Sequence, residues 1–230
     1  MRAAVVGTGR MGKLVEQVLR TRGHDVTATI SRALNARGEA LTSATLGAPE
    51  VVIEFTTPDA APVIVPRLLD LGLAVVTGTT GWNPDEADLR ARVQAHGGAL
   101  LHAANFALGV HALAAAAREL ARRLGPRDGY DVHMIEMHHA AKKDAPSGTA
   151  VFLQHVLADE GANTGITSVR TGEVPGTHTI TWDAAGETVR LEHVVRNRAV
   201  FAEGAVRAAE WLVGRKGVFT IDQMLTGRQP

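Results

Sequence analysis

Residues 2–20 read R-A-A-V-V-G-T-G-R-M-G-K-L-V-E-Q-V-L-R, in which three glycines separate a short apolar run from a segment with helical apolar spacing. The run before Gly7 is typical of a buried strand, and the segment after Gly12 is typical of an amphipathic helix. Gly7 permits a tight turn, Gly9 lets a pyrophosphate approach the backbone, and Gly12 lets the helix lie close to the strand. Because a helix N-terminus attracts phosphate, this pattern predicts a dinucleotide-binding domain; a purely structural glycine turn is the alternative.

Further apolar runs continue the alternation of strand and helix. Short strands are predicted at Val26–Ile30, Val51–Phe55, Ala74–Thr77 and Ala99–Leu101. This alternation predicts an α/β fold built on a Rossmann-type, doubly wound parallel sheet, which binds its ligand at the carboxyl ends of the strands. The helix expected between Asp59 and Gly72 contains Pro66, so we expect a kink or a break there.

Small and polar residues follow several of these strands, and we call them the cofactor rim. Their threonine and asparagine side chains are suited to hydrogen-bond a nicotinamide carboxamide, and the small residues leave room for its ring. The residues predicted to contact the cofactor are Gly7, Thr8, Gly9, Arg10, Met11, Gly12, Ser31, Arg32, Gly78, Thr79, Thr80, Ala103, Ala104, Asn105 and Phe106.

Ser31 and Arg32 follow the second predicted strand and bear on the choice of cofactor. An acidic residue usually holds the adenosine ribose hydroxyls at this position. A hydroxyl and a guanidinium suit a 2′-phosphate better, and Arg10 adds a second cation. We therefore favour NADPH over NADH; the alternative is that both arginines are solvated surface side chains.

The second half of the chain predicts a different kind of domain. A helix is expected at Leu108–Leu124, strands of alternating polarity follow it, and the short turn Ala184–Gly186 favours antiparallel pairing. A last helix is expected at Ala202–Val213. We predict a dinucleotide-binding domain of residues 1–107 plus 203–230, and a second, α+β domain of residues 108–202 with a mixed or antiparallel sheet.

The stretch E-M-H-H-A-A-K-K-D-A-P-S-G-T-A, Glu136–Ala150, holds most of the candidate chemistry. Ser147 is a good N-cap, so the backbone N–H groups after it are available to an anion. Imidazoles that exchange protons near neutrality and lysine ammonium groups lie just before this helix start. We interpret the stretch as a carboxylate-binding loop. A metal site is disfavoured because His138, His139 and Asp144 are irregularly spaced.

The composition limits the possible partners. The chain has 230 residues, of which 45% are hydrophobic and 21% charged, as in a globular protein of one or two domains. A net charge of zero gives no overall attraction to nucleic acid or an anionic membrane, so a small-molecule partner is expected. The absence of cysteine excludes a thiol nucleophile. Met1 leads directly into a strand, without signal-peptide features, and we expect a cytoplasmic protein.

Several motifs, in order along most of the chain, resemble those of the dihydrodipicolinate reductase family. They are G-T-G-R-M-G, E-F-T-T-P at Glu54–Pro58, G-T-T-G at Gly78–Gly81, A-A-N-F at Ala103–Phe106, the Glu136–Ala150 stretch and F-A-E-G-A-V-R-A-A-E-W-L at Phe201–Leu212. The resemblance implies reduction of a cyclic imine dicarboxylate by NADPH or NADH in lysine and diaminopimelate biosynthesis. It also implies a second domain that binds substrate and builds a homotetramer through its sheet.

The same resemblance assigns roles within the Glu136–Ala150 stretch. His138 and Lys142 match the family's catalytic proton donors. Lys143 falls where the family does not demand a lysine, so it receives no role. The residues that match contacts to a substrate carboxylate are His139, Gly148 and Thr149.

The chain departs from the family pattern near the adenosine end of the expected cofactor site. Ser31 replaces a frequent acidic residue, and the segment that leads to Val51 is short. Two other functions remain open on the residues alone: a different Rossmann oxidoreductase, and a non-catalytic module that senses dinucleotides. Neither alternative accounts for the histidines and lysines of the Glu136–Ala150 stretch.

Overall fold

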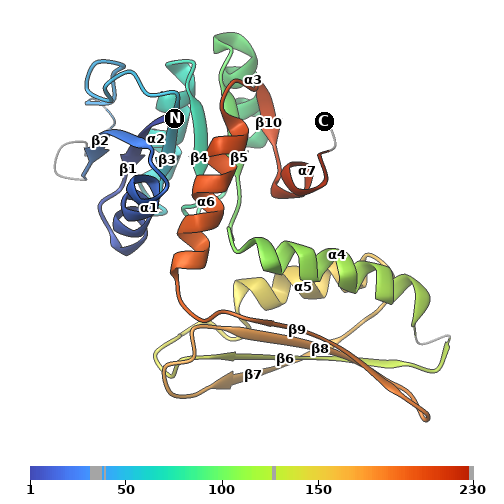
Figure 1. Ribbon diagram of the computed structural model, residues 1–230. Helices are drawn as coiled ribbons and strands as arrows, with labels where there is room; N and C mark the ends of the chain where they lie inside the picture. Colours follow the sequence, from blue (N-terminus) through green and yellow to red (C-terminus); the bar gives the residue numbers. More distant parts are fainter. Residues whose placement is uncertain (32–37, 39, 126–127, 228–230) are drawn as a thin grey trace. The chain divides into compact units, whose positions relative to one another are not determined.

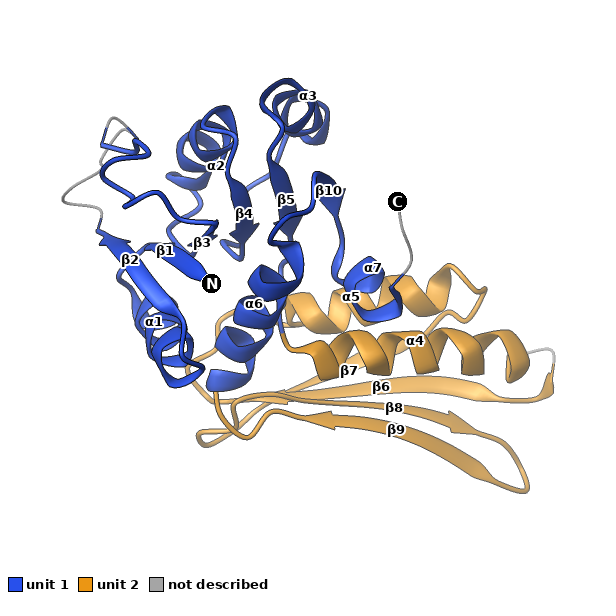
Figure 2. Cartoon of the chain, turned by 45° about the horizontal axis from the view of Figure 1, so that its top comes forward, with its two compact units in different colours: residues 1–106, 199–230 blue, residues 107–198 orange. Residues whose placement is uncertain are grey.

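The structure is a computed structural model that describes residues 1–31, 38, 40–125 and 128–227. The chain divides into two compact units (Figure 2). Unit 1 contains residues 1–106 and 199–230, and unit 2 contains residues 107–198. Each unit has its own sheet and its own helices, and each is described separately below.

Unit 1 is built on a six-stranded, wholly parallel sheet with the order β10-β5-β4-β3-β1-β2. Its strands are β1 (Arg2–Val6), β2 (Asp25–Ile30), β3 (Val51–Glu54), β4 (Ala74–Thr77), β5 (Ala99–His102) and β10 (Gly217–Phe219). The chain reverses direction across the sheet between β1 and β3, and a doubly wound sheet binds its ligand at such a switch point. The predicted Rossmann-type parallel sheet is confirmed.

Helices cover both faces of this sheet, which explains why its central strands are apolar without alternation. The helices of unit 1 are α1 (Arg10–Thr21), α2 (Ala61–Asp70), α3 (Glu86–His96), α6 (Ala199–Leu212) and α7 (Ile221–Thr226). α1 packs beside α6, and α2 packs beside α3 on the opposite face (Figure 1). β10 extends the sheet beyond β5, and the short helix α7 follows it; sequence patterns predicted neither element.

Pro66 does not break α2, which runs through it to Asp70. The missing N–H of a proline within a helix costs about 3 kcal/mol. That cost is outweighed by the burial of Ile64, Val65 and Leu68 against the sheet, since each buried aliphatic side chain contributes roughly 1.5–3 kcal/mol. Of the expected kink or break, the break is therefore wrong, because tertiary packing overrides the local preference.

Unit 2 contains a four-stranded mixed sheet with two helices on one face (Figure 1). Its elements are α4 (Leu108–Arg123), β6 (Asp131–His138), α5 (Gly148–Ala158), β7 (Gly165–Arg170), β8 (Thr177–Asp183) and β9 (Thr188–Val194). The strand order is β7-β6-β8-β9; β7 pairs parallel with β6 and the other two pairs are antiparallel. This confirms the predicted mixed sheet.

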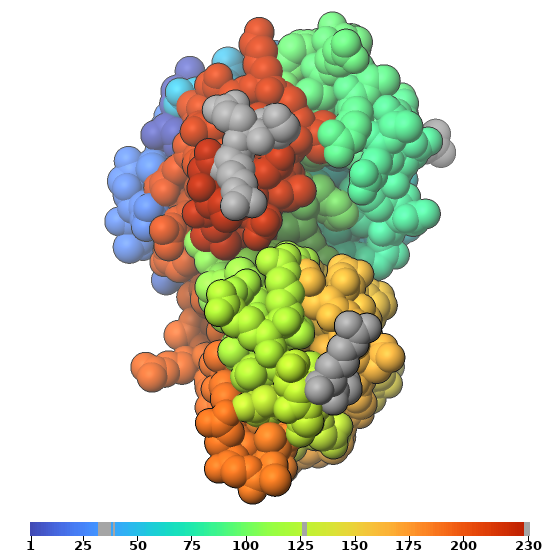
Figure 3. Space-filling model, turned by 90° about the vertical axis from the view of Figure 1, so that its right-hand side faces the viewer, coloured from blue at the N-terminus to red at the C-terminus, as the bar shows by residue number. Residues whose placement is uncertain are grey.

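The core of unit 2 lies between this sheet and its two helices. Trp182 and Met134 from the strands are fully buried, as is Leu153 from α5. α4 and α5 lie side by side and form the yellow-green and gold surface in the lower part of Figure 3. Among the described residues, none of the helices is both long enough and apolar enough to cross a membrane.

Candidate active site

The glycine turn of unit 1 has backbone geometry that other residues would disturb. Gly7 has φ +112°, and a Cβ atom there would lie 2.0 Å from the carbonyl oxygen of Phe55. A Cβ atom on Gly12 would lie 1.8 Å from the carbonyl oxygen of Gly7, so α1 packs tightly on the turn. A Cβ atom on Gly9, in contrast, would meet nothing within 4 Å. The turn therefore has open space at Gly9, directly before the first residue of α1.

The other predicted cofactor contacts near this turn are exposed or half-buried. Thr8 and Arg10 are exposed, and Met11 is half-buried at the start of α1. Ser31 is half-buried after β2, and Arg32 lies outside the described residues. Among the described residues no side chain caps α1, and the start of this helix adjoins the open space at Gly9.

A buried carboxylate, Glu54, organises the loops that follow β3 and β4. It is fully buried and accepts hydrogen bonds from the backbone N–H of Thr56 at 2.7 Å and from the hydroxyl of Thr79 at 2.6 Å. The hydroxyls of Thr56 and Thr77 also donate to it. The side chain of Thr79, predicted to face the cofactor, is thus committed to holding the rim together, and the role of Glu54 was not predicted.

Aromatic packing explains part of the remaining rim. A Cβ atom on Gly78 would lie 2.1 Å from the ring of Phe55, so the small size of this glycine accommodates a protein side chain. Phe55 also packs edge-on against Phe106, with ring centroids 6.0 Å apart. Thr80 and Ala104 are exposed, whereas the half-buried members of this part of the rim are Gly78, Ala103 and Asn105.

In unit 2, Glu136 and His138 form a hydrogen-bonded pair on the covered face of the sheet. They lie two residues apart on β6, so strand geometry places both side chains on the same face. Glu136 is fully buried and His138 is 8% exposed. Nδ1 of His138 hydrogen-bonds Oε2 of Glu136. The other carboxylate oxygen accepts from Nη2 of Arg170 at 2.6 Å and from the backbone N–H of Ser147 at 3.3 Å.

These contacts determine the charge of the pair. Burial raises the pKa of Glu136, but hydrogen bonds from Arg170, Ser168 and His138 outweigh it and bring that pKa to about 2. Burial lowers the pKa of His138, and the adjacent Glu136 carboxylate opposes this shift. At neutral pH Glu136 is therefore ionised, and the nitrogen of His138 that faces it must be the one that carries a hydrogen.

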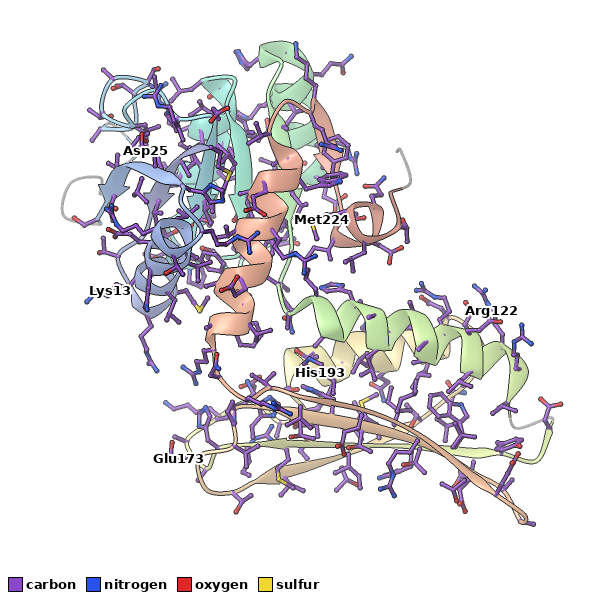
Figure 4. The ribbon with its side chains drawn as sticks, viewed as in Figure 1. Lys13, Asp25, Arg122, Glu173, His193 and Met224 are labelled. Atoms are coloured by element: carbon purple, nitrogen blue, oxygen red, sulfur yellow. The ribbon has the colours of Figure 1, made fainter. Side chains whose placement is uncertain are left out.

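His178 adds a second buried imidazole to this site. It lies opposite Glu136 on β8, its Nε2 is 3.2 Å from the hydroxyl of Ser147, and its ring centroid is 5.3 Å from that of His138. Burial, and next the charge of His138, lower the pKa of His178 to about 4. His193 pairs with His178 across β8 and β9, and Figure 4 shows it close to the start of α4. β6 and β8 thus contribute buried polar side chains, and the half-buried His193 on β9 continues the row.

Ligand atoms of Glu136, His138 and His178 lie within 4.8 Å of one another, a spacing that a metal ion could bridge. This set differs from the histidines and aspartate considered from the sequence. Both oxygens of Glu136 already accept hydrogen bonds, one of them from the guanidinium of Arg170. A metal ion here would meet that positive charge, so we interpret the group as a hydrogen-bonded carboxylate–imidazole cluster.

The loop after β6 brings the other predicted substrate residues to the same end of unit 2. The ammonium of Lys142 lies 2.8 Å from Oδ1 of Asp144, and its backbone N–H donates to the carbonyl of His139 at 3.1 Å. His139 Nε2 lies 3.3 Å from Nη2 of Arg198. Lys143 is exposed.

Ser147 caps α5 as predicted, because its hydroxyl accepts from the backbone N–H of Ala150 at 3.2 Å. Gly148 is exposed, and a Cβ atom on it would meet nothing within 4 Å. Thr149 is half-buried beside it. The start of α5 therefore has open space at Gly148.

Sequence reasoning missed Arg170, His178 and Arg198, and it gave Glu136 no role. The E-x-H spacing was a usable signal, since alternate residues of a strand share a face. Arg170 and His178 come from β7 and β8, and only the register of the sheet brings them to Glu136. No spacing within the sequence reveals that register.

Comparison with known proteins gives consistent results over the whole chain. Family models described as the N-terminus and the C-terminus of dihydrodipicolinate reductase match residues 1–106 and 109–225. The 4-hydroxy-tetrahydrodipicolinate reductase of Christiangramia forsetii is 32% identical over 239 residues, covering 98% of each chain. The enzyme of the same name from Ralstonia nicotianae is 33% identical over 270 residues, covering 98% of this chain and 99% of its own.

A solved structure shares the fold. Dipicolinate-bound dihydrodipicolinate reductase from Paenisporosarcina sp. TG-14 superposes with a TM-score of 0.77 at 22% identity, covering 96% of this chain and 97% of the other. Together with the family models and the curated relatives, this leads to one conclusion. The chain belongs to the dihydrodipicolinate reductase family.

Proposed function

We propose that this chain reduces 4-hydroxy-tetrahydrodipicolinate to tetrahydrodipicolinate with NADPH or NADH, as a step of lysine and diaminopimelate biosynthesis. Its relatives bear the name of a reductase of this substrate. The proposal rests mainly on three features that occur together at one end of unit 2. They are the buried carboxylate–imidazole pair, a lysine and a helix start with open space beside it. A dinucleotide-sensing module would have no need of these groups.

Unit 1 has the features needed to hold the nicotinamide cofactor. The open space at Gly9 and the uncapped start of α1 fit a pyrophosphate, because helix N-termini stabilise anions. When bound, the cofactor supplies a hydride to C4 of the substrate ring. We further propose NADPH as the preferred donor, supported by Arg10 and by Ser31 in place of an acidic residue.

Unit 2 is proposed to bind the dicarboxylate. Gly148 borders open space at the start of α5, Thr149 follows it, and the side chains of Lys142 and His139 lie on the adjoining loop. Each charge-assisted hydrogen bond to a carboxylate contributes roughly 1.5–3 kcal/mol. Several such bonds would orient the ring as well as hold it.

We propose that His138 and Lys142 transfer protons during the reaction. Loss of the C4 hydroxyl as water leaves a conjugated imine, hydride addition at C4 gives an enamine, and a proton delivered to carbon restores the imine. Nδ1 of His138 is hydrogen-bonded to Glu136, so Nε2 is the nitrogen available to exchange a proton with the substrate. A Cβ atom on Gly176 would lie 3.0 Å from that Nε2, so the glycine leaves space at the nitrogen.

The test is oxidation of NADPH by the purified protein after addition of freshly generated substrate. The expected result is oxidation that requires the substrate, with kcat/KM larger for NADPH than for NADH. A sensor would bind NADPH without oxidising it. Another Rossmann oxidoreductase would leave this substrate unreduced, and either outcome would overturn the proposal.

A further inference from the structure

We propose that Glu136 is a positioning residue that fixes the tautomer and orientation of His138, and that Arg170 holds Glu136 in place for this task. The inference rests on the proposed function, because it deepens the role given to His138. Nothing in the pattern of the sequence or in the names of the relatives assigns a task to either residue.

The first argument is geometric. Glu136 and His138 project from the same face of β6, and a carboxylate can only accept, so Nδ1 of His138 must donate to it. Nδ1 therefore retains its hydrogen whether the imidazole is neutral or charged. The proton that His138 gives and receives is on Nε2, the nitrogen beside Gly176. A hydrogen-bonded carboxylate thus selects one of two tautomers, as it does for imidazoles at other catalytic sites.

The second argument is the cost of placing Glu136 there. A fully buried carboxylate is expensive, and an apolar side chain of similar size would stabilise the strand at least as well. The chain nevertheless supplies donors from separate elements: Arg170 from β7, the backbone of Ser147 at the start of α5, and His138 from β6. Because these donors lower the pKa of Glu136 to about 2, it remains an acceptor at neutral pH.

The charges around His138 give the expected direction of its titration. The groups that act on it are Glu136 on its own strand, Lys142 on the loop, Arg170 on β7 and His178 on β8. Of these, Glu136 is the group that raises the pKa of His138; Lys142 and Arg170 lower it. Removing the charge of Glu136 should therefore make the imidazolium of His138 less stable, so that it loses its proton at lower pH.

The experiment is a double-mutant cycle with E136Q, H138Q and the double variant, each checked for a native thermal unfolding transition. E136Q should lower kcat about 10- to 100-fold, by analogy with the range found for carboxylates that orient metal-binding imidazoles, with KM for NADPH unchanged. It should also move the pH at which kcat declines to a lower value. In the H138Q background the same change should have no further effect on kcat.

The outcomes separate the two proposals. An equal loss in both backgrounds would make Glu136 merely structural and would overturn this inference. Wild-type turnover by H138Q would instead remove His138 from the proposed mechanism, whatever E136Q does.

A second measurement uses the unaltered protein and does not depend on whether E136Q folds. Nitrogen-15 NMR of the labelled histidines should show neutral His138 with its hydrogen on Nδ1, and the Nε2–H tautomer would overturn the inference. R170M should weaken the Nδ1–H signature, and R122M, which removes an exposed arginine at the far end of α4, should leave it unchanged (Figure 4).

Discussion

Lys142 carries the charge on which the proposed proton transfer most directly depends. Its side chain is 24% exposed and lies 2.8 Å from Asp144. We expect Lys142→Ala to lower kcat roughly 100-fold or more, within the range for loss of a proton-transfer group. The Kd for NADPH should stay unchanged, because the cofactor is proposed to bind unit 1. Steady-state kinetics and a fluorescence titration with NADPH measure the two quantities.

The neighbouring residue provides a matched control for this substitution. Lys143→Ala removes the same charge from an exposed position one residue along the loop. It should keep wild-type turnover. If both variants lost activity equally, general electrostatic attraction would replace the specific role of Lys142.

His178 should make the stability of the protein depend on pH. Its pKa falls from an ordinary 6.5 to about 4 on folding, chiefly through burial. Between these values the unfolded chain binds a proton that the folded chain does not, so the free energy of unfolding decreases as the pH falls. The contribution amounts to about 3 kcal/mol. It is fully present above pH 6.5 and lost by pH 4.

Urea unfolding at a series of pH values measures this contribution. His178→Asn should flatten the pH dependence relative to wild type, and His155→Asn, at an exposed position on α5, should leave it unaltered. Equal slopes for wild type and His178→Asn would show that His178 is not the titrating group.

At the scale of the elements, the sequence predicts the helices and strands whose apolar residues form a pattern of sufficient length. The strand predicted at Ala74–Thr77 from its apolar residues is the observed strand β4. β10 has three residues and α7 has six, too few for a periodic pattern. α7 nevertheless begins with a capping box between Thr220 and Gln223, a signal that spacing alone contains.

The residues of the candidate site also fall into two groups: those that a local pattern predicts and those that only the folded sheet brings together. His138, Lys142 and the cap at Ser147 are local features of one stretch, so pattern and resemblance were sufficient to select them. The partnership of Glu136 with Arg170 depends on two strands being aligned, which is a property of the folded sheet. Likewise, the sequence does not show that the hydroxyl of Thr79, a predicted cofactor contact, donates to the buried Glu54.

Gly204 in α6 tests how tightly this helix packs within unit 1. A Cβ atom there would lie 1.8 Å from the carbonyl oxygen of Phe106, a backbone atom that cannot move aside easily. Gly204→Ala should lower the free energy of unfolding by about 1–3 kcal/mol despite the better helix propensity of alanine. Gly186→Ala, where a Cβ atom meets nothing within 4 Å, is the control. A stabilised Gly204→Ala variant would contradict the close approach.

At the scale of the whole molecule, the sheet of unit 2 presents one covered face and one open face. Within the described part of unit 2, both helices lie on the covered face (Figure 1). The open face contains Ile135, 41% exposed, and Val194, 51% exposed. Exposed apolar side chains on a broad sheet are typical of surfaces that associate with another chain. We therefore propose, as the family resemblance implies, that the protein is a homotetramer assembled through these sheets.

Ile135→Glu tests that assembly, because a charge in the middle of an apolar interface cannot be solvated once the chains meet. Light scattering should give a mass of four chains for the wild type and a smaller mass for the variant. Val63→Glu is the matched control, since Val63 is an apolar residue of comparable exposure, 48%, on α2 of unit 1. A monomeric wild type would overturn the proposed tetramer. Dissociation by both variants would mean that assembly does not depend specifically on the open face of the unit 2 sheet.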